Sequence, residues 1–205
     1  LQDYQNAAWA DRYSALVARV QQAEAPLGST RLSLSVARNL FKLMAFKDEY
    51  EVARLLTSPA FQAQVNAQFE GDWKMTYHFA PSWLGGERKG QRPRKRTFGP
   101  AWQGALKMLA WGRRLRGTWL DPLRFSHEQR EHWRLLQDYE AVLSRLLSDL
   151  RTETLETACQ MAELPDRIRG YGAIRQASAE AVRRQWEHWE RKTRQAAEEL
   201  GAGEA

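Results

Sequence analysis

Residues 126–150, SHEQREHWRLLQDYEAVLSRLLSDL, contain the most regular apolar pattern in the chain. Apolar side chains recur there every three or four residues, at Leu136, Tyr139, Leu143, Leu146 and Leu150. This spacing places them on one face of an α-helix. Ser126 and Gln129 form a capping-box pattern at its start. Because the stripe covers only about two heptads, which is short for a coiled coil, we expect it to pack against other helices of the same chain.

The same periodicity predicts helices on both sides of this stretch. They are expected at residues 3–24, 33–57, 59–68, 100–116, 152–164 and 173–199. Residues 73–79 and 94–98 instead combine aromatic and β-forming side chains, and glycines and Pro93 lie between them. We therefore predict a mostly α, multi-helix, bundle-like domain with one small β-hairpin at about residues 73–98.

Composition limits the classes of protein to consider. The chain has 205 residues, of which 43% are hydrophobic and nine are tryptophan, as in a globular protein with a real core. Its one cysteine, Cys159, excludes an internal disulfide and a cysteine-ligated zinc or iron–sulfur site, and its apolar helical setting predicts a buried, inert thiol. Neither a long apolar run nor a secretory signal pattern is visible, so we expect a cytoplasmic protein without a membrane span.

The residues that most often carry catalysis form no recognisable site in this sequence. A nucleophile-elbow pattern is absent, and His127 and His132 are five apart, which is not the spacing of a helical metal site. We expect both histidines on a solvated face. Asp48, Glu49 and Glu51 stand among basic neighbours, which predicts exposed or interfacial ion pairs. We therefore assign no catalytic, cofactor-binding or metal-binding residue.

The positive charge of the chain is concentrated in one region. The net charge is +6, and residues 88–116 hold ten Lys and Arg but no Asp or Glu. Within this region, Arg92, Arg94, Lys95 and Arg96 are candidate partner contacts. A basic loop of this kind suits a solvated surface or an acidic protein partner. The alternative is a module that binds an anion through Arg88–Arg96, either nucleic acid or coenzyme A, although we do not expect nucleic acid.

A second candidate contact surface is the segment 165–172, where charged residues stand beside two glycines. The pattern predicts a compact, rigid turn rich in hydrogen bonds. Its candidate contacts are Asp166, Arg167, Arg169 and Tyr171.

Five stretches, taken together, resemble one known family. They are LQDYQNAAWA at 1–10, VARNLFKLMAFKDEYEVARL at 36–55, RPRKRTFGP at 92–100, LRGTWLDP at 115–122 and LPDRIRGYG at 164–172. Their order and spacing resemble the C-terminal region of the large, fused bacterial indolepyruvate ferredoxin oxidoreductases. The resemblance covers nearly the whole chain, and the stretch 36–55 is the most specific.

The resemblance implies that the chain is part of a larger enzyme. Such enzymes oxidatively decarboxylate aryl and other 2-oxoacids to acyl-CoA with thiamine diphosphate, magnesium and 4Fe–4S clusters, and ferredoxin accepts the electrons. In that family the cofactor motifs lie in upstream domains, so no cofactor is expected in this fragment, which is not expected to be an enzyme alone. The lack of an initiator Met before Leu1 agrees with an excised segment.

The resemblance also implies a domain organisation and partners. Residues 1–30 correspond to the end of a preceding catalytic-type domain, and 31–205 to a helical C-terminal domain. We expect a structural or docking role, with the upstream domains of the same polypeptide as partners and a homo-oligomer as the assembly. None of the matching stretches is a catalytic motif of the family, so no catalytic residue is carried over.

Overall fold

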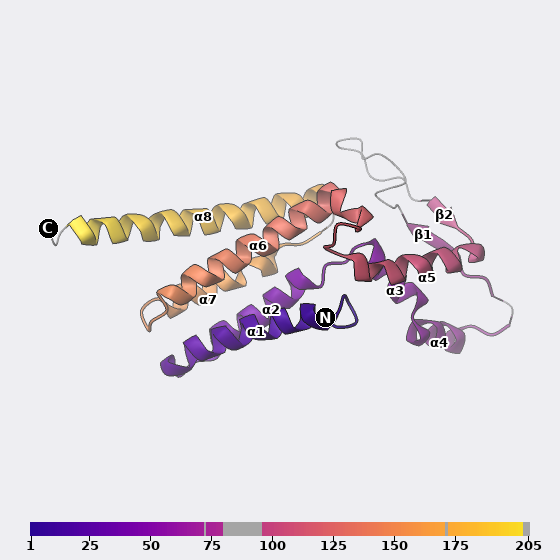
Figure 1. Ribbon diagram of the computed structural model, residues 1–205, viewed down its shortest axis with the longest axis horizontal. Coiled ribbons are helices and arrows are strands. Elements are labelled where there is room, and N and C mark those ends of the chain that lie inside the picture. The colour runs from indigo at the N-terminus through magenta and orange to yellow at the C-terminus, as the bar shows by residue number, and fades with distance from the viewer. Residues whose placement is uncertain (72, 80–95, 171, 203–205) are drawn as a thin grey trace. The chain divides into compact units, whose positions relative to one another are not determined.

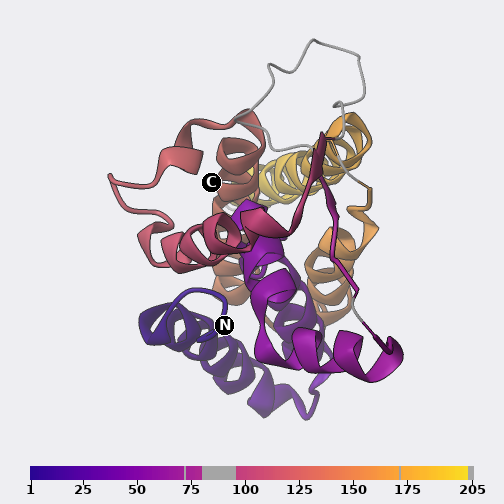
Figure 2. The same cartoon turned by 90° about the vertical axis from the view of Figure 1, so that its right-hand side faces the viewer.

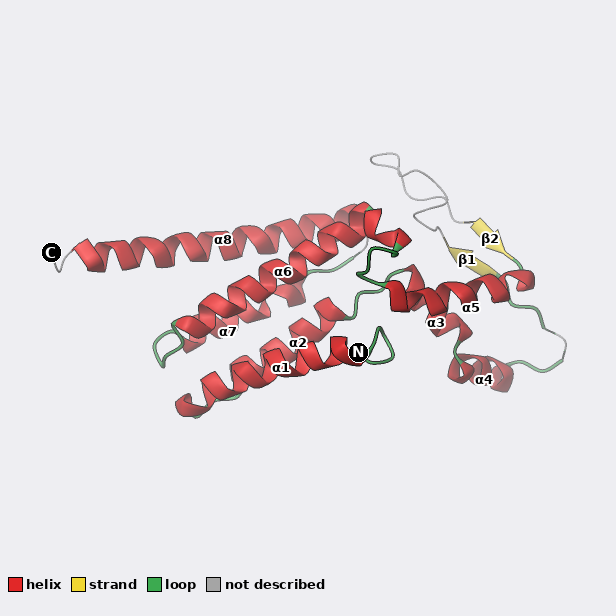
Figure 3. Cartoon of the chain, viewed as in Figure 1, coloured by secondary structure: helices red, strands yellow, loops and turns green. Residues whose placement is uncertain are grey.

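The computed structural model describes residues 1–71, 73–79, 96–170 and 172–202. In this part of the chain almost all regular structure is helical, which confirms the mostly α prediction (Figure 3). The elements are α1 (Ala7–Glu24), α2 (Arg31–Met44), α3 (Glu49–Thr57), α4 (Pro59–Gln68), β1 (Tyr77–Phe79), β2 (Arg96–Phe98), α5 (Gln103–Trp111), α6 (His127–Ser148), α7 (Leu155–Glu163) and α8 (Gly172–Ala202) (Figure 1).

The chain forms two compact units, each made of two separate stretches of sequence. Unit 1 comprises Leu1–Ala10 and Ala45–His132, and unit 2 comprises Asp11–Met44 and Trp133–Ala205. Helices α1 and α6 each begin in unit 1 and continue into unit 2. The boundary predicted at residue 30 concerns an upstream domain and stays a prediction.

The single helix predicted over residues 33–57 is wrong, because the structure has two helices there. Helix α2 ends at Met44 and α3 begins at Glu49. Between them Asp48 has an extended backbone, and its side chain accepts a hydrogen bond from the Glu51 amide at 2.9 Å. This is the geometry of a helix N-cap. The two helices belong to different units.

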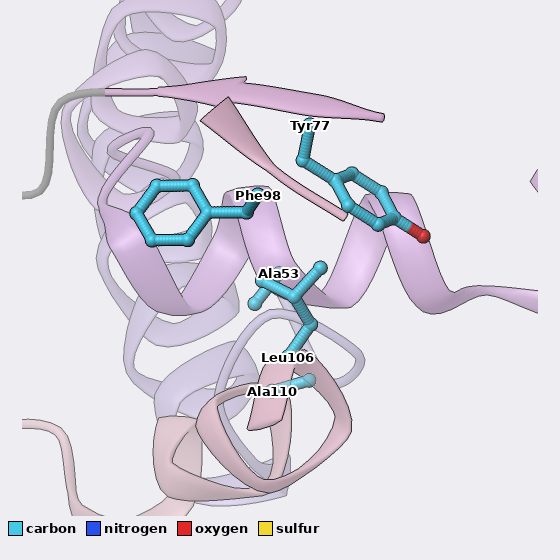
Figure 4. Packing of buried hydrophobic residues seen from close by; sticks show 5 residues of the cluster. All are labelled: Ala53, Tyr77, Phe98, Leu106 and Ala110. Carbon is cyan, nitrogen blue, oxygen red and sulfur yellow. The ribbon is translucent and has the colours of Figure 1, made fainter. Parts of the chain in front are cut away.

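The core of unit 1 lies between the hairpin and two helices. Ala53 of α3 packs with Leu106 and Ala110 of α5 and with Tyr77 and Phe98 of the strands (Figure 4). The strands are antiparallel, and Tyr77 pairs directly with Phe98, so both side chains lie on the face that the helices cover. Figures 1 and 2 show the hairpin beside α3 and α5. The predicted hairpin is confirmed with shorter strands, and its connection at 80–95 lies outside the described residues.

The helix predicted over 100–116 is also shorter than expected. Helix α5 ends at Trp111, and a 3₁₀ helix follows over Gly112–Leu115. A Cβ atom on Gly112 would lie 2.9 Å from Cε1 of Tyr50, closer than side chains pack. Glycine at this position therefore allows the chain to approach the Tyr50 ring.

Unit 2 is built on the predicted stripe of α6. Four of its five apolar residues are buried there, namely Leu136, Tyr139, Leu143 and Leu146. The Tyr139 hydroxyl donates a hydrogen bond to the Ala162 carbonyl of α7 at 2.9 Å, and its ring stacks on Trp186 of α8 with centroids 5.8 Å apart. Cys159 is buried as predicted, and burial raises the pKa of its thiol. At the start of α6, the Ser126 hydroxyl oxygen accepts from the Gln129 amide, as the capping pattern predicts.

The start of α2 is held by a buried carboxylate. Glu24 is fully buried and accepts hydrogen bonds from the Leu32 and Ser33 amides, each at 2.8 Å, and from the Ser33 hydroxyl. These groups lie eight and nine residues further along the chain, too far for a local capping pattern to reveal.

No helix among the described residues is both long enough and apolar enough to cross a membrane.

Candidate functional site

Unit 1 contains a cluster of buried charged side chains, Asp48, Arg116 and Asp121, with Arg116 at its centre. The residue follows the 3₁₀ helix Gly112–Leu115, and only 3% of it is exposed. Its Nε donates to Oδ2 of Asp48 at 2.7 Å, and Nη2 donates to Oδ1 at 2.6 Å. This two-pronged contact is the strong form of an arginine–carboxylate pair.

Two tyrosines complete the surroundings of the guanidinium. Its carbon lies 3.8 Å from the ring centroid of Tyr4 and 5.5 Å from that of Tyr50, within the range of a cation–π contact. Nη1 donates to the Tyr4 carbonyl at 2.5 Å, and Gln5 Nε2 donates to the Arg116 carbonyl at 3.3 Å. The N-terminal segment is thereby fixed to Arg116, which lies 112 residues further along the chain than Tyr4.

A second buried carboxylate extends this network. The Tyr50 hydroxyl donates to Oδ1 of Asp121 at 2.9 Å. Asp121 also accepts from the Leu123 amide at 3.0 Å and, through Oδ2, from the Gly117 amide at 3.1 Å. These two amide contacts shape the turn between Arg116 and the 3₁₀ helix Pro122–Phe125, a turn in which Gly117 has a positive φ of 76°.

Burial governs the acid–base behaviour of the network. It raises the pKa of the Asp48 carboxyl, while Arg116 and the Glu51 amide oppose the rise because they bind the charged form. The pKa of Tyr50 is raised by burial and by Asp121, and that of Tyr4 mainly by burial. Both phenols therefore keep their protons at neutral pH. Asp48, Arg116 and Asp121 already bind partners within unit 1, so the arrangement suits a structural role.

The structure corrects the expected positions of two groups. Asp48 is in an ion pair, as predicted, but the pair is buried and not exposed. His132, expected on a solvated face, is 5% exposed and stacks on Phe46 with ring centroids 4.2 Å apart. His127 is exposed, as predicted. Glu51 forms an ion pair with Arg54 at 2.7 Å, and both side chains are partly buried.

The structure describes only some of the predicted partner contacts. Arg92, Arg94, Lys95 and Tyr171 lie outside the described residues, and only the backbone of Arg96, in β2, is described.

The other three predicted contacts, Asp166, Arg167 and Arg169, are exposed in unit 2. The Lys42 ammonium donates to the carbonyl oxygens of Pro165 and Asp166 at 3.0 and 3.1 Å, which holds this turn against α2. Their role as contacts stays a prediction.

Large apolar side chains are exposed on α5 and on the turn after it. Met108 and Trp111 are three residues apart on α5 and are 73% and 57% exposed. Trp119 and Leu120, in the turn shaped by Asp121, are 79% and 53% exposed. We call these four residues the aromatic surface. Sequence periodicity did not reveal it, because apolar residues on a helix are normally interpreted as core, and Trp119 and Leu120 lie in a turn that has no periodic pattern.

Among the described residues, no group of three or more His, Cys, Asp or Glu side chains is placed to hold a metal ion. Comparison with protein families gives one match, over residues 1–188, to a family described as of unknown function. The chain belongs to the DUF6537 family. The match to DUF6537 covers all of unit 1 and most of unit 2. Neither curated proteins nor solved structures give a match.

Proposed function

We propose that this DUF6537 chain is a structural docking domain of a 2-oxoacid:ferredoxin oxidoreductase. The observation that carries the docking role is the aromatic surface, because large apolar side chains exposed in this way are typical of protein contacts. The buried Arg116 network supports the role, since it fixes the turn that presents Trp119. The enzyme class rests on the resemblance of the five sequence stretches.

In this proposal the chemistry belongs to upstream domains of the whole cytoplasmic protein. They would convert an aryl 2-oxoacid and coenzyme A to acyl-CoA and carbon dioxide, and two electrons would pass to ferredoxin. Thiamine diphosphate, magnesium and 4Fe–4S clusters would be held there. The aromatic surface would contact those domains or a second copy of the chain in a homo-oligomer.

The test uses the whole natural protein with Trp111→Ser and Trp119→Ser together. The control is Leu34→Ser on α2 of unit 2, since Leu34 is 56% exposed and lies outside the aromatic surface. Light scattering after size-exclusion chromatography measures assembly, and ferredoxin reduction with an aryl pyruvate and coenzyme A measures activity. We expect the double variant, but not the control, to lose assembly and activity together.

Two results would count against separate parts of the proposal. Unchanged assembly and activity in the double variant would remove the docking role of the aromatic surface. A correctly assembled wild-type protein that oxidises no 2-oxoacid would instead remove the enzyme class and leave docking standing.

A further inference from the structure

Unit 2 contains a cavity where the end of α6, the start of α7 and the second half of α8 meet. Its volume is about 480 Å³, within the range of small-ligand sites. One part of its wall is apolar and consists of Leu146, Ala158 and Trp189. Leu146 and Ala158 are buried, and Trp189 is half-buried, so the wall offers a flat aromatic ring beside aliphatic groups.

The acidic side chains of the lining are paired with arginines. Glu190 of α8 forms an ion pair with Arg145 of α6. Asp149 and Glu153 both contact Arg151, at 2.9 and 3.7 Å. These two arginines offset two of the three negative charges of the lining.

Arg194 is the lining cation without such a pair. Across the described residues, its side chain makes no ion pair. The hydroxyl protons of Ser148 and Thr193 are already donated to backbone carbonyls, at 2.8 and 3.0 Å. Arg194 is therefore the main group available to recognise a negatively charged group in the cavity, because its guanidinium suits a carboxylate, and the Thr157 hydroxyl of the lining can also donate.

We propose that this cavity binds a small organic anion with an aromatic body. The body would lie against Trp189, Leu146 and Ala158, and its carboxylate would face Arg194. The Arg145–Glu190 pair joins α6 to α8 and would hold the two walls at a fixed separation. This site belongs to unit 2 and is independent of the docking role proposed for the aromatic surface of unit 1.

The test measures binding to the full chain by titration calorimetry with two probes of similar shape. These are 1-naphthoate and the uncharged 1-naphthalenemethanol. We expect 1-naphthoate to bind with one-to-one stoichiometry and about tenfold more tightly than the alcohol, which is the contribution of one charge-assisted contact at a solvated rim. Arg194→Gln should lower naphthoate affinity to that of the alcohol and leave alcohol binding unchanged.

Lys192→Gln is the matched control, since Lys192 lies two residues away on α8 and lines a neighbouring hollow instead. We expect it to leave naphthoate affinity unchanged. Because both residues are exposed, both variants should keep the far-ultraviolet circular dichroism of the wild type. The proposal is overturned if naphthoate does not bind at millimolar concentration, if the alcohol binds equally well, or if Lys192→Gln weakens binding as much as Arg194→Gln.

Discussion

The ion pair of Arg116 with Asp48 shows how one contact joins distant parts of the sequence. The two residues are 68 positions apart, and both side chains are almost completely buried. Removing one member of such a pair leaves an unpaired charge inside the protein, which is far less favourable than losing an exposed pair. The pair is therefore expected to control the stability of unit 1.

Asp48→Asn keeps the shape of the side chain and an acceptor for the α3 N-cap but removes the charge opposite Arg116. We expect the free energy of unfolding to fall by about 3–5 kcal/mol, measured by urea denaturation. Arg54→Gln, which breaks the partly buried pair with Glu51 on α3, should cost less, about 0.5–1 kcal/mol. Equal effects from the two variants would contradict a dominant role for the buried pair.

Glu24 makes the stability of unit 2 depend on pH. Burial alone would raise the pKa of its carboxyl, but the hydrogen bonds from Ser33 and Leu32 outweigh burial and lower the pKa below its ordinary value. A lowered folded-state pKa means that this stabilisation is complete above the ordinary pKa of glutamate, about 4.3. It is lost as the pH falls through the folded-state pKa.

We therefore expect the wild-type melting temperature to drop on acidification from pH 6 to below pH 4, measured by circular dichroism. Glu24→Gln should be less stable at pH 6 and should show a smaller drop over the same interval. The prediction fails if the acid-induced drop is the same in both proteins.

Among the elements, α5 and the 3₁₀ helix after it show how a glycine sets the packing distance. A Cβ atom on Gly112 would lie 2.9 Å from the Tyr50 ring, whereas a Cβ atom on Gly104, on the exposed side of α5, would have no other atom within 4 Å. The two glycines therefore form a matched pair, in which the same substitution tests packing at one position and helix propensity at the other.

We expect Gly112→Ala to destabilise the protein by about 1–3 kcal/mol, because the new methyl group would displace the Tyr50 ring and disturb its bond to Asp121. Gly104→Ala should stabilise it by about 0.5–1 kcal/mol, because alanine favours the helix. Thermal unfolding of both variants checks the signs. A neutral Gly112→Ala would show that Tyr50 adjusts freely.

For the molecule as a whole, the two units are linked by continuous helices. Because α1 and α6 run from unit 1 into unit 2, loss of structure in unit 1 releases one end of each helix that unit 2 uses. Cys159 offers a way to observe this, since it is buried in unit 2 and is the single thiol of the chain.

The native thiol should react with a disulfide reagent only when unit 2 opens, because the side chain is 2% exposed and burial raises its pKa. We expect Asp48→Asn, which changes unit 1 alone, to accelerate the labelling of Cys159. Arg54→Gln serves as the control with a wild-type rate. An unchanged rate in Asp48→Asn would mean that the units open independently.

The sequence by itself determined the kinds of element and much of the core. Periodic apolar residues predicted the stripe of α6, and aromatic and β-forming residues predicted the hairpin. The helix predicted over 59–68 begins at Pro59, where the Ser58 hydroxyl caps it. These are local features, set by helix and strand geometry within a few residues. The burial of Cys159 followed from the same periodicity.

Only the tertiary structure decided the break at residues 45–48, the two units and the Arg116 network. In the sequence, Asp48 is one of several acidic residues in a charged stretch. Only the fold brings it into contact with Arg116, which is 68 residues away. Glu24 likewise becomes a helix cap only when α2 folds back over it. A buried charge is stable only when an oppositely charged or hydrogen-bonding partner lies beside it. The identity of that partner depends on how the helices pack, and a local sequence pattern contains no information about this packing.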